Sequence, residues 1–124
     1  MKRIAIIEDN DDLRNLMRLP LQAAGYEVVT YRDGSAFSAD SMTQSHLYFI
    51  DLDLGGASGL DLCKLLKRKK QNGCAPFIII VSANPDVREL AMEARADDAL
   101  PKPFASKELL QKAEQYFQVE SPEF

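Results

Sequence analysis

Short apolar runs alternate along the chain with longer segments in which apolar residues recur every three or four positions. The runs are "RIAIIED" at residues 3–9, "YEVVTY" at 26–31, "HLYFIDLDL" at 46–54, "APFIIIVSA" at 75–83 and "DALPKPF" at 98–104. Runs of this length predict strands. The fourth is apolar at nearly every position, which predicts burial on both faces, and the prolines in the last predict a short strand.

The segment after the first run has the spacing of an amphipathic helix. Capping residues "NDD" precede it, and the apolar positions are Leu13, Leu16, Met17, Leu21 and Ala24. We expect Gly25 to stop this helix, and Pro20 to kink it or end it early.

Four further helices are expected. The capping residues but poor apolar stripe of "DGSAFSADSMTQ", residues 33–44, predict a short one. The others are marked by Leu62, Leu65 and Leu66, ending near Lys70; by Val87, Leu90, Ala91 and Ala94; and by residues 105–118, opened by a capping Ser106. Strands and helices thus alternate five times, which predicts an α/β fold with a parallel sheet, right-handed crossovers and helices on both faces.

The length of 124 residues suits one domain, which we expect at residues 1–118 with a tail or linker at 119–124. No apolar run approaches the ~18 residues of a membrane span, and the acids that follow the basic start argue against a signal peptide. The net charge of −4 argues mildly against nonspecific nucleic-acid binding. Cys63 and Cys74 lack C-x-x-C spacing and are expected to be reduced thiols of a cytoplasmic protein.

Polar side chains stand where the expected strands end. They are Glu8 and Asp9 after the first strand, Asp51 and Asp53 at the third, Ser82 at the fourth and Lys102, followed by Pro103, at the fifth. Because ligands of parallel sheets bind at the carboxyl ends of strands, these groups would share one pocket if the first, third, fourth and fifth strands are neighbours.

This set of residues suits phosphoryl transfer. Acids around one point raise each other's pKa unless a cation neutralises them, and hard carboxylate oxygens suit Mg²⁺. A carboxylate can also attack phosphorus, with Lys102 and the Ser82 hydroxyl available to the transferring group. Taken singly, each acid is more simply a solvated turn residue, Ser82 a strand-end hydroxyl bonding backbone, and Lys102 a surface lysine.

At this point the sequence resembles the receiver domains of bacterial two-component response regulators, from residue 3 to about residue 117. The matching elements are "IIEDN", "FIDLDL" with Gly59 eight residues after Asp51, "IIIVSA" and "DDALPKPF". The resemblance implies a flavodoxin-like fold of five βα units, with a doubly wound five-stranded parallel sheet in the order 2-1-3-4-5.

The resemblance also implies roles for the strand-end residues. Glu8 and Asp9 would be the acid pair that holds Mg²⁺, together with Asp51 and the backbone carbonyl of Asp53. Asp51 would accept a phosphoryl group from a histidine kinase or histidine phosphotransfer protein. Ser82 would be the switch hydroxyl and Lys102 the phosphate-pairing lysine, with a bond to Pro103 that is often cis in the family.

Further implications concern partners. The phosphorylated domain would switch its interactions with an output domain or protein, acting as a signalling domain rather than an enzyme, although it would catalyse its own phosphorylation and dephosphorylation. No nucleic-acid or membrane contact is expected from this chain.

Three positions depart from the family pattern. Gly55 stands where a proline is common, Ala99 where an aromatic residue usually turns inward, and Arg95 where a glycine is common. We therefore expect a signalling movement that does not depend on a buried ring, and a changed turn at Arg95.

Two alternative functions are weighed against the receiver. "DLDLGG" also resembles the D-x-D motif of haloacid dehalogenase-type phosphatases, but that motif lies on their first strand. A non-phosphorylated scaffold, or pseudo-receiver, usually loses the acids or the lysine, which this chain keeps.

The remaining motifs have plain interpretations. The sole histidine, His46, is expected to be a strand-edge residue rather than a phosphorelay or metal site. "KRKK" at residues 67–70 is more simply a solvated helix end than a nucleic-acid patch. Asp97 and Asp98 could form part of a protein–protein surface or simply begin a strand.

Overall fold

The computed structural model describes residues 2–35, 45–54, 58–68 and 76–120. Its strands are β1 (Arg3–Ile7), β2 (Glu27–Tyr31), β3 (Leu47–Asp51), β4 (Phe77–Ser82) and β5 (Asp98–Pro101). Its helices are α1 (Asp11–Ala23), α3 (Gly59–Arg68), α4 (Val87–Glu93) and α5 (Ser106–Glu120). Most of the helix expected at residues 33–44 lies outside the described residues, as do Gly55 and Cys74.

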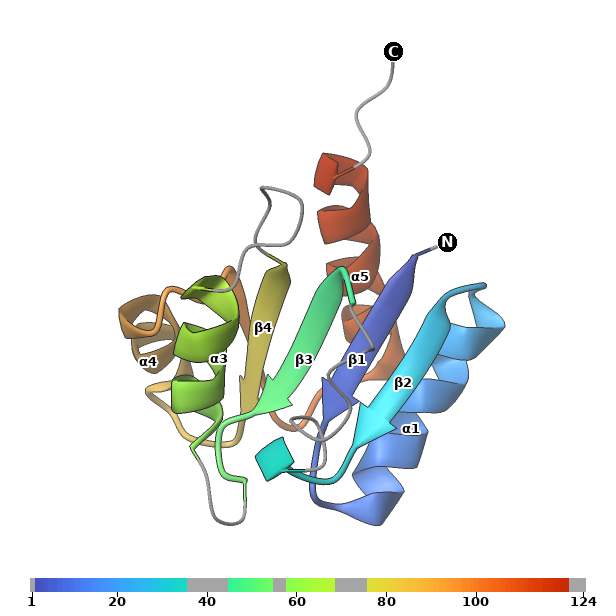
Figure 1. Ribbon diagram of the computed structural model, residues 1–124. Coiled ribbons are helices and arrows are strands. Elements are labelled where there is room, and N and C mark those ends of the chain that lie inside the picture. The colour runs from blue at the N-terminus through green and yellow to red at the C-terminus, as the bar shows by residue number, and fades with distance from the viewer. Residues whose placement is uncertain (1, 36–44, 55–57, 69–75, 121–124) are drawn as a thin grey trace.

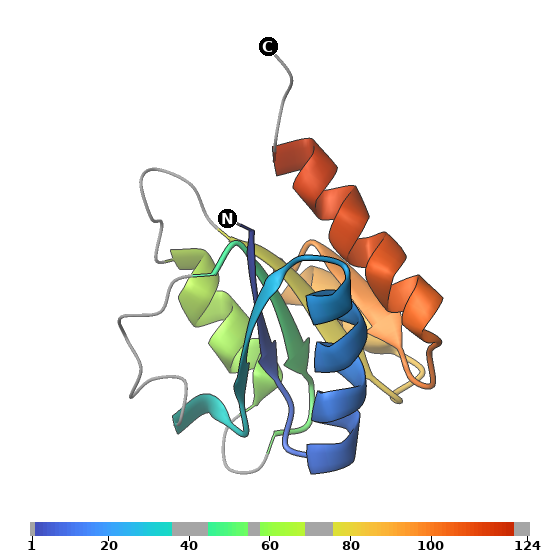
Figure 2. The same cartoon turned by 90° about the vertical axis from the view of Figure 1, so that its right-hand side faces the viewer.

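The strands form one parallel sheet in the order β2-β1-β3-β4-β5, which confirms the predicted fold. The labelled arrows in Figure 1 point the same way, so the carboxyl ends of the strands gather at the lower edge of the sheet. Figure 2 shows the sheet between α3 on one side and α1 and α5 on the other. The first, third, fourth and fifth strands are therefore neighbours, as a shared pocket requires.

Alternating side chains of each central strand build two apolar layers. In β1, Ile4 and Ile6 pack toward α1 and α5, whereas Ala5 and Ile7 pack toward α3 and α4. Every residue of β3 is buried, and so is every residue of β4 after Phe77, which confirms the prediction of burial on both faces. The sheet is thus a fixed platform for its loops.

Helix α1 begins as predicted but does not end early. The Asn10 side chain accepts the Leu13 N–H, and Gly25 lies just past the helix at φ +100°. Pro20 has no backbone N–H to donate, but its carbonyl accepts the Ala24 N–H at 3.0 Å, so the last turn of the helix still closes. Leu16 does not join the core, because 64% of it is exposed.

Helix α5 begins at Ser106 itself, and the Ala105 N–H donates to the Glu108 carboxylate at 2.9 Å. Glu108 therefore caps this end, in place of the cap expected from Ser106. The helix runs to Glu120, two residues past the expected boundary at 118, and the division into domain and tail stays a prediction. None of the described helices has the length and apolar character needed to cross a membrane.

The basic run begins in the last turn of α3 with Lys67, which joins three elements of the fold. The Lys67 ammonium donates to the Pro76 carbonyl at 2.8 Å and to the Asp97 carboxylate, which also accepts the Ile78 N–H. Lys67 thereby ties α3 to the starts of β4 and β5 and is not a simple solvated cation. His46 is a strand-edge residue as expected, and its Nδ1 accepts the Arg3 N–H at 3.1 Å.

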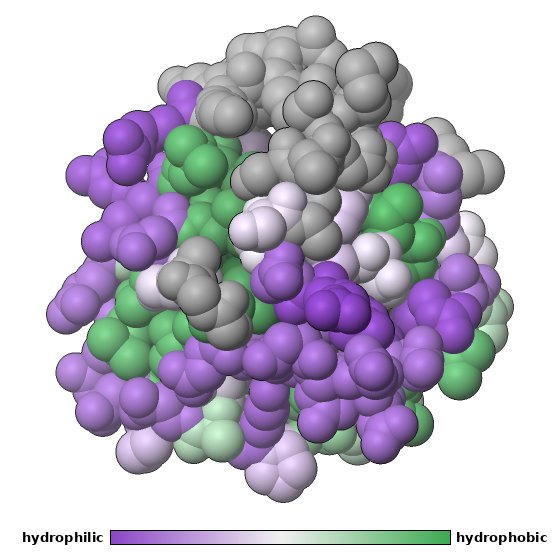
Figure 3. All heavy atoms as spheres, turned by 60° about the horizontal axis from the view of Figure 1, so that its bottom comes forward, coloured by the Kyte–Doolittle hydropathy of each residue, from purple (hydrophilic) through white to green (hydrophobic). Residues whose placement is uncertain are grey.

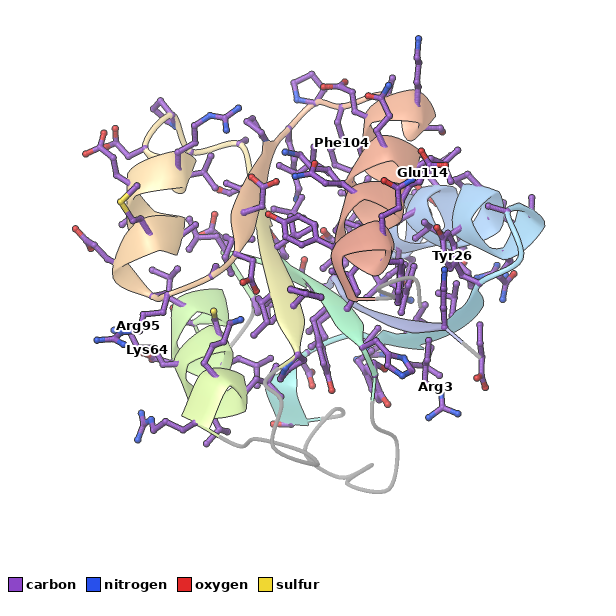
Figure 4. The ribbon with its side chains drawn as sticks, turned by 90° about the horizontal axis from the view of Figure 1, so that it is seen from above. Arg3, Tyr26, Lys64, Arg95, Phe104 and Glu114 are labelled. Atoms are coloured by element: carbon purple, nitrogen blue, oxygen red, sulfur yellow. The ribbon has the colours of Figure 1, made fainter. Side chains whose placement is uncertain are left out.

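Arg95 occupies the left-handed conformation that glycine usually adopts, with φ +66°. The Ala96 N–H donates to the Ala91 carbonyl and the Arg95 N–H to the Met92 carbonyl, which is the Schellman pattern of a helix end. The turn thus keeps its shape, with an arginine held at a position that disfavours a Cβ. Figure 4 shows the Arg95 side chain directed outward from the loop between α4 and β5.

We predict that Arg95→Gly raises the free energy of unfolding by up to about 1 kcal/mol, because it removes the Cβ from a left-handed residue. Urea denaturation of both proteins measures the change. Arg95→Ala is the matched control: it loses the same charge but keeps the Cβ, so its free energy of unfolding should not rise. An equal gain in both variants would contradict this explanation.

Candidate functional site

Three carboxylates converge where β1 and β3 end. Glu8 and Asp9 follow β1 directly, and Asp51 is the last residue of β3. One carboxylate oxygen from each lies within 4.8 Å of the others. Glu8 is only 2% exposed and Asp51 5%, whereas Asp9 is exposed. The fold therefore brings together the three acids that the sequence predicted.

Lys102 is the cation of this cluster. Its ammonium nitrogen lies 3.3 Å from Glu8 Oε1 and 3.4 Å from Asp51 Oδ1. Its backbone N–H donates to the Ser82 carbonyl at 2.8 Å, which fixes the exit of β5 against that of β4. The Lys102–Pro103 peptide bond is cis, as the resemblance implied.

Ser82 and Asp53 lie at or just past the ends of neighbouring strands at the same edge of the sheet, but they are not part of the cluster of three acids and Lys102. Ser82 ends β4, is 1% exposed, and its hydroxyl oxygen accepts the Asn84 N–H at 3.0 Å. Asp53 lies beyond the end of β3 with an exposed side chain, and its N–H donates to Asp51 Oδ1 at 3.4 Å. The strand expected to run through residue 54 thus ends at Asp51, because the chain turns there toward a bridge between Asp53 and Ser58.

Sequence reasoning did not identify two residues that hold the acid pair in place. The Asn10 N–H donates to Glu8 Oε2 at 3.2 Å, and the Arg14 guanidinium donates to the Glu8 backbone carbonyl at 2.9 Å. Arg14 also pairs with Asp11. The capping motif pointed to Asn10 as a helix cap but not to its backbone, and no sequence signal marked Arg14.

Burial changes the acidity of two carboxyl groups in the cluster. Desolvation raises the pKa of Glu8 from 4.5 to about 7, although the Asn10 N–H and Lys102 oppose the rise. Desolvation also raises the pKa of Asp51, against the pull of Lys102 and the Asp53 N–H. A single lysine therefore does not offset the cost of burying these carboxylates together.

The donor set fits a hard divalent cation. Glu8 Oε1 is buried and accepts no well-formed hydrogen bond from the described residues, so one acid oxygen is left for another ligand. The ligand atoms of the cluster are all carboxylate oxygens, which suit Mg²⁺.

The site opens toward solvent at the carboxyl end of the sheet. Figure 3 shows this end of the molecule, with hydrophilic side chains across its middle and hydrophobic ones on both sides of them. A hollow of about 500 Å³ adjoins it, lined by Asp9, Asp53, Ser58, Leu52, Leu54, Leu60 and Leu90. A small donor or a partner's side chain could reach the acids from solvent.

Comparison with known proteins places this chain among receiver domains. Residues 4–114 match the family described as the response regulator receiver domain. The transcriptional regulator PhoB of Rhizobium meliloti is 32% identical over 99% of this chain and 55% of its own length. The regulator SphR of Synechococcus elongatus is 34% identical over 87% of this chain and 46% of its own.

Solved structures agree. Response regulator TrrA of Thermotoga maritima, in complex with Mg²⁺-BeF, has a TM-score of 0.80 and 30% identity, over 93% of this chain and 98% of its own. Response regulator DrrB of the same organism has a TM-score of 0.85 and 26% identity, over 98% of this chain and 54% of its own.

These findings define a receiver domain of the kind that response regulators carry. The chain belongs to the response regulator receiver family, and is a signalling domain. It spans about half the length of the transcriptional regulators that it matches.

We predict that the free energy of unfolding without metal falls as pH rises from about 4.5 to about 7 and is level above, because folded Glu8 keeps its proton longer than the unfolded chain does. The raised pKa of Asp51 acts with the same sign. Glu8→Gln should flatten much of this slope and stabilise the protein at neutral pH. Urea titrations across that range measure it.

The exposed Glu89 of α4 provides a matched control. Glu89→Gln removes a carboxylate outside the site and should keep the full slope. A slope that survives Glu8→Gln would show that burial of Glu8 is not its source.

Proposed function

We propose that this domain accepts a phosphoryl group from a partner's phosphohistidine onto Asp51. The observation that carries the proposal is a nearly buried Asp51 carboxylate set between two further acids and the Lys102 ammonium. Isolated buried acids are costly, so an arrangement of this kind implies a ligand that uses the charges. The chain is 30% identical to TrrA, whose structure was solved in complex with Mg²⁺-BeF, and this likeness supports the same proposal.

In the reaction, an Asp51 carboxylate oxygen attacks the phosphorus. The new O–P bond forms as the P–N bond to the donor imidazole breaks, and the leaving nitrogen keeps the bonding electrons and takes a proton. Later hydrolysis by water returns the carboxylate and releases inorganic phosphate. The domain would thus catalyse only its own phosphorylation and dephosphorylation.

The other residues of the site would stabilise the charge of the phosphoryl group, each in a different way. Glu8, Asp9, Asp51 and the Asp53 carbonyl would hold Mg²⁺, which when bound would neutralise charge on the phosphoryl oxygens. Lys102, already 3.4 Å from Asp51 Oδ1, offers a cation to the phosphoryl group. Ser82 offers a hydroxyl proton to one of its oxygens.

The partners follow from this chemistry. The donor is a histidine kinase or a histidine phosphotransfer protein, and the downstream partner is an output domain or protein whose contacts with this domain change on phosphorylation. The absence of nucleic acid and membranes from the partners of this chain stays a prediction. That the protein acts in the cytoplasm also stays a prediction.

The rival functions receive less support. A dehalogenase-type phosphatase needs its second aspartate as a general acid, and the Asp53 side chain is exposed, with only its backbone N–H bonded to Asp51. A scaffold without phosphorylation has no use for a buried acid cluster with a lysine.

We predict that Asp51→Asn abolishes phosphorylation by a small donor such as phosphoramidate with Mg²⁺, because an amide is no nucleophile. Asp53→Asn keeps the backbone carbonyl and should be phosphorylated within about tenfold of the wild-type rate, although the lifetime of the aspartyl phosphate can change. Intact mass over time measures both.

The paired variants separate the two reaction types. Loss of a general acid costs roughly 10²–10⁴ in rate, so a phosphatase would lose turnover in Asp53→Asn. If Asp53→Asn blocks the reaction as completely as Asp51→Asn does, the receiver chemistry is wrong for this chain.

A further inference from the structure

Gly59 lies in direct contact with the backbone of the proposed phosphoacceptor. It is the first residue of α3, and a Cβ built there would stand 2.1 Å from the Asp51 carbonyl oxygen. The same Cβ would lie 3.0 Å from the Asp51 carbonyl carbon and 3.1 Å from Leu52 Cα. All three atoms belong to the backbone, so no flexible side chain can move aside to make room.

Hydrogen bonds join the residues just after β3 to the residues that begin α3. The Gly59 N–H donates to the Leu52 carbonyl at 3.1 Å, and Asp53 and Ser58 form an antiparallel bridge. The Ser58 hydroxyl accepts the Leu60 N–H at 3.1 Å and caps the first turn of α3. The start of α3 and the exit of β3 therefore hold each other in position.

The other charged groups of the site are anchored elsewhere. The Glu8 N–H donates to the Tyr31 carbonyl of β2, and the Lys102 N–H to the Ser82 carbonyl of β4. Neither of these two bonds involves β3, so a displacement of the β3 exit would act first on Asp51. It would change the distances from Asp51 to Glu8 and Lys102.

We propose that Gly59 is a positioning residue for the phosphoryl-transfer site: its missing side chain lets α3 rest on the Asp51 carbonyl and sets the Asp51 carboxylate and the Asp53 carbonyl against Lys102 and Glu8. This inference rests on the proposed function. A displacement of about 1 Å at a reacting group can cost about 10²-fold in rate, so one added methyl group should be felt in the chemistry.

Gly59→Ala tests the proposal, with Gly25→Ala as the matched control. Gly25 has φ +100° and nothing within 4 Å of a built Cβ, so the same substitution there strains the backbone without a collision. Gly25 lies just before β2, at the amino end of the parallel sheet, whereas Asp51 is the last residue of β3, at the carboxyl end. Both variants are also made in the Arg95→Gly background, so that a stabilised fold is available if Gly59→Ala alone unfolds.

Three measurements are made on each variant: the denaturation midpoint, the rate of phosphorylation by phosphoramidate at saturating Mg²⁺, and the amide shifts of Asp51 and Asp53 without donor. We expect both variants to lose stability. Gly59→Ala should phosphorylate about 10- to 100-fold more slowly and shift both amides, whereas Gly25→Ala should stay within about twofold and shift neither.

The outcomes separate this inference from the function on which it rests. If the folded Gly59→Ala protein is phosphorylated as fast as Gly25→Ala, Gly59 only fits the packing and the inference is overturned. If the unaltered protein takes no phosphate from phosphoramidate, while keeping a mass that shows an intact chain, the proposed function falls and the inference with it.

Discussion

The structure depends on one electrostatic constraint, the burial of Glu8 and Asp51 next to each other with Lys102 as their nearest cation. Carboxylates in a poorly hydrated site lose solvation and repel each other, and the raised pKa values of both groups express that cost. The cost is borne only where the surrounding backbone cannot relax. Contacts of the loops and helix ends around the site keep the backbone of these residues in place.

The restraints come from several separate elements. Asn10 and Arg14 hold Glu8 through its side chain and its carbonyl, and the β4–β5 contact holds Lys102. Gly59 supplies a different kind of restraint, because it brings α3 against the backbone of Asp51. Since these anchors lie on different strands and helices, the geometry of the cluster is a property of the whole carboxyl edge of the sheet.

Whether a feature could be predicted from the sequence depends on how far apart along the chain its interacting residues lie. Alternating strands and helices, the strand-end acids and Lys102 were predictable, since they depend on local patterns and on the way parallel strands align. Lys67 was not, because its pairing with Asp97 joins residues thirty apart, and the exposure of Leu16 depends on which face α1 presents to the sheet. Gly59 could be noted in the sequence, but only the folded contact shows why a side chain is excluded there.

Ala99 leaves the proposed signal to be carried by the backbone around Ser82. Ala99 pairs with Ile80 in the sheet and is 3% exposed, and a methyl group has no alternative rotamer with which to report a change. The Ser82 hydroxyl accepts the Asn84 N–H and still has a proton to donate, since a hydroxyl can do both at once. A phosphoryl oxygen on Asp51 that accepted a hydrogen bond from this hydroxyl would therefore draw Ser82 toward Asp51, and Asn84 with it. Because the Asn84 carbonyl accepts the N–H of Val87, the first residue of α4, that pull would reach the start of a helix of only seven residues.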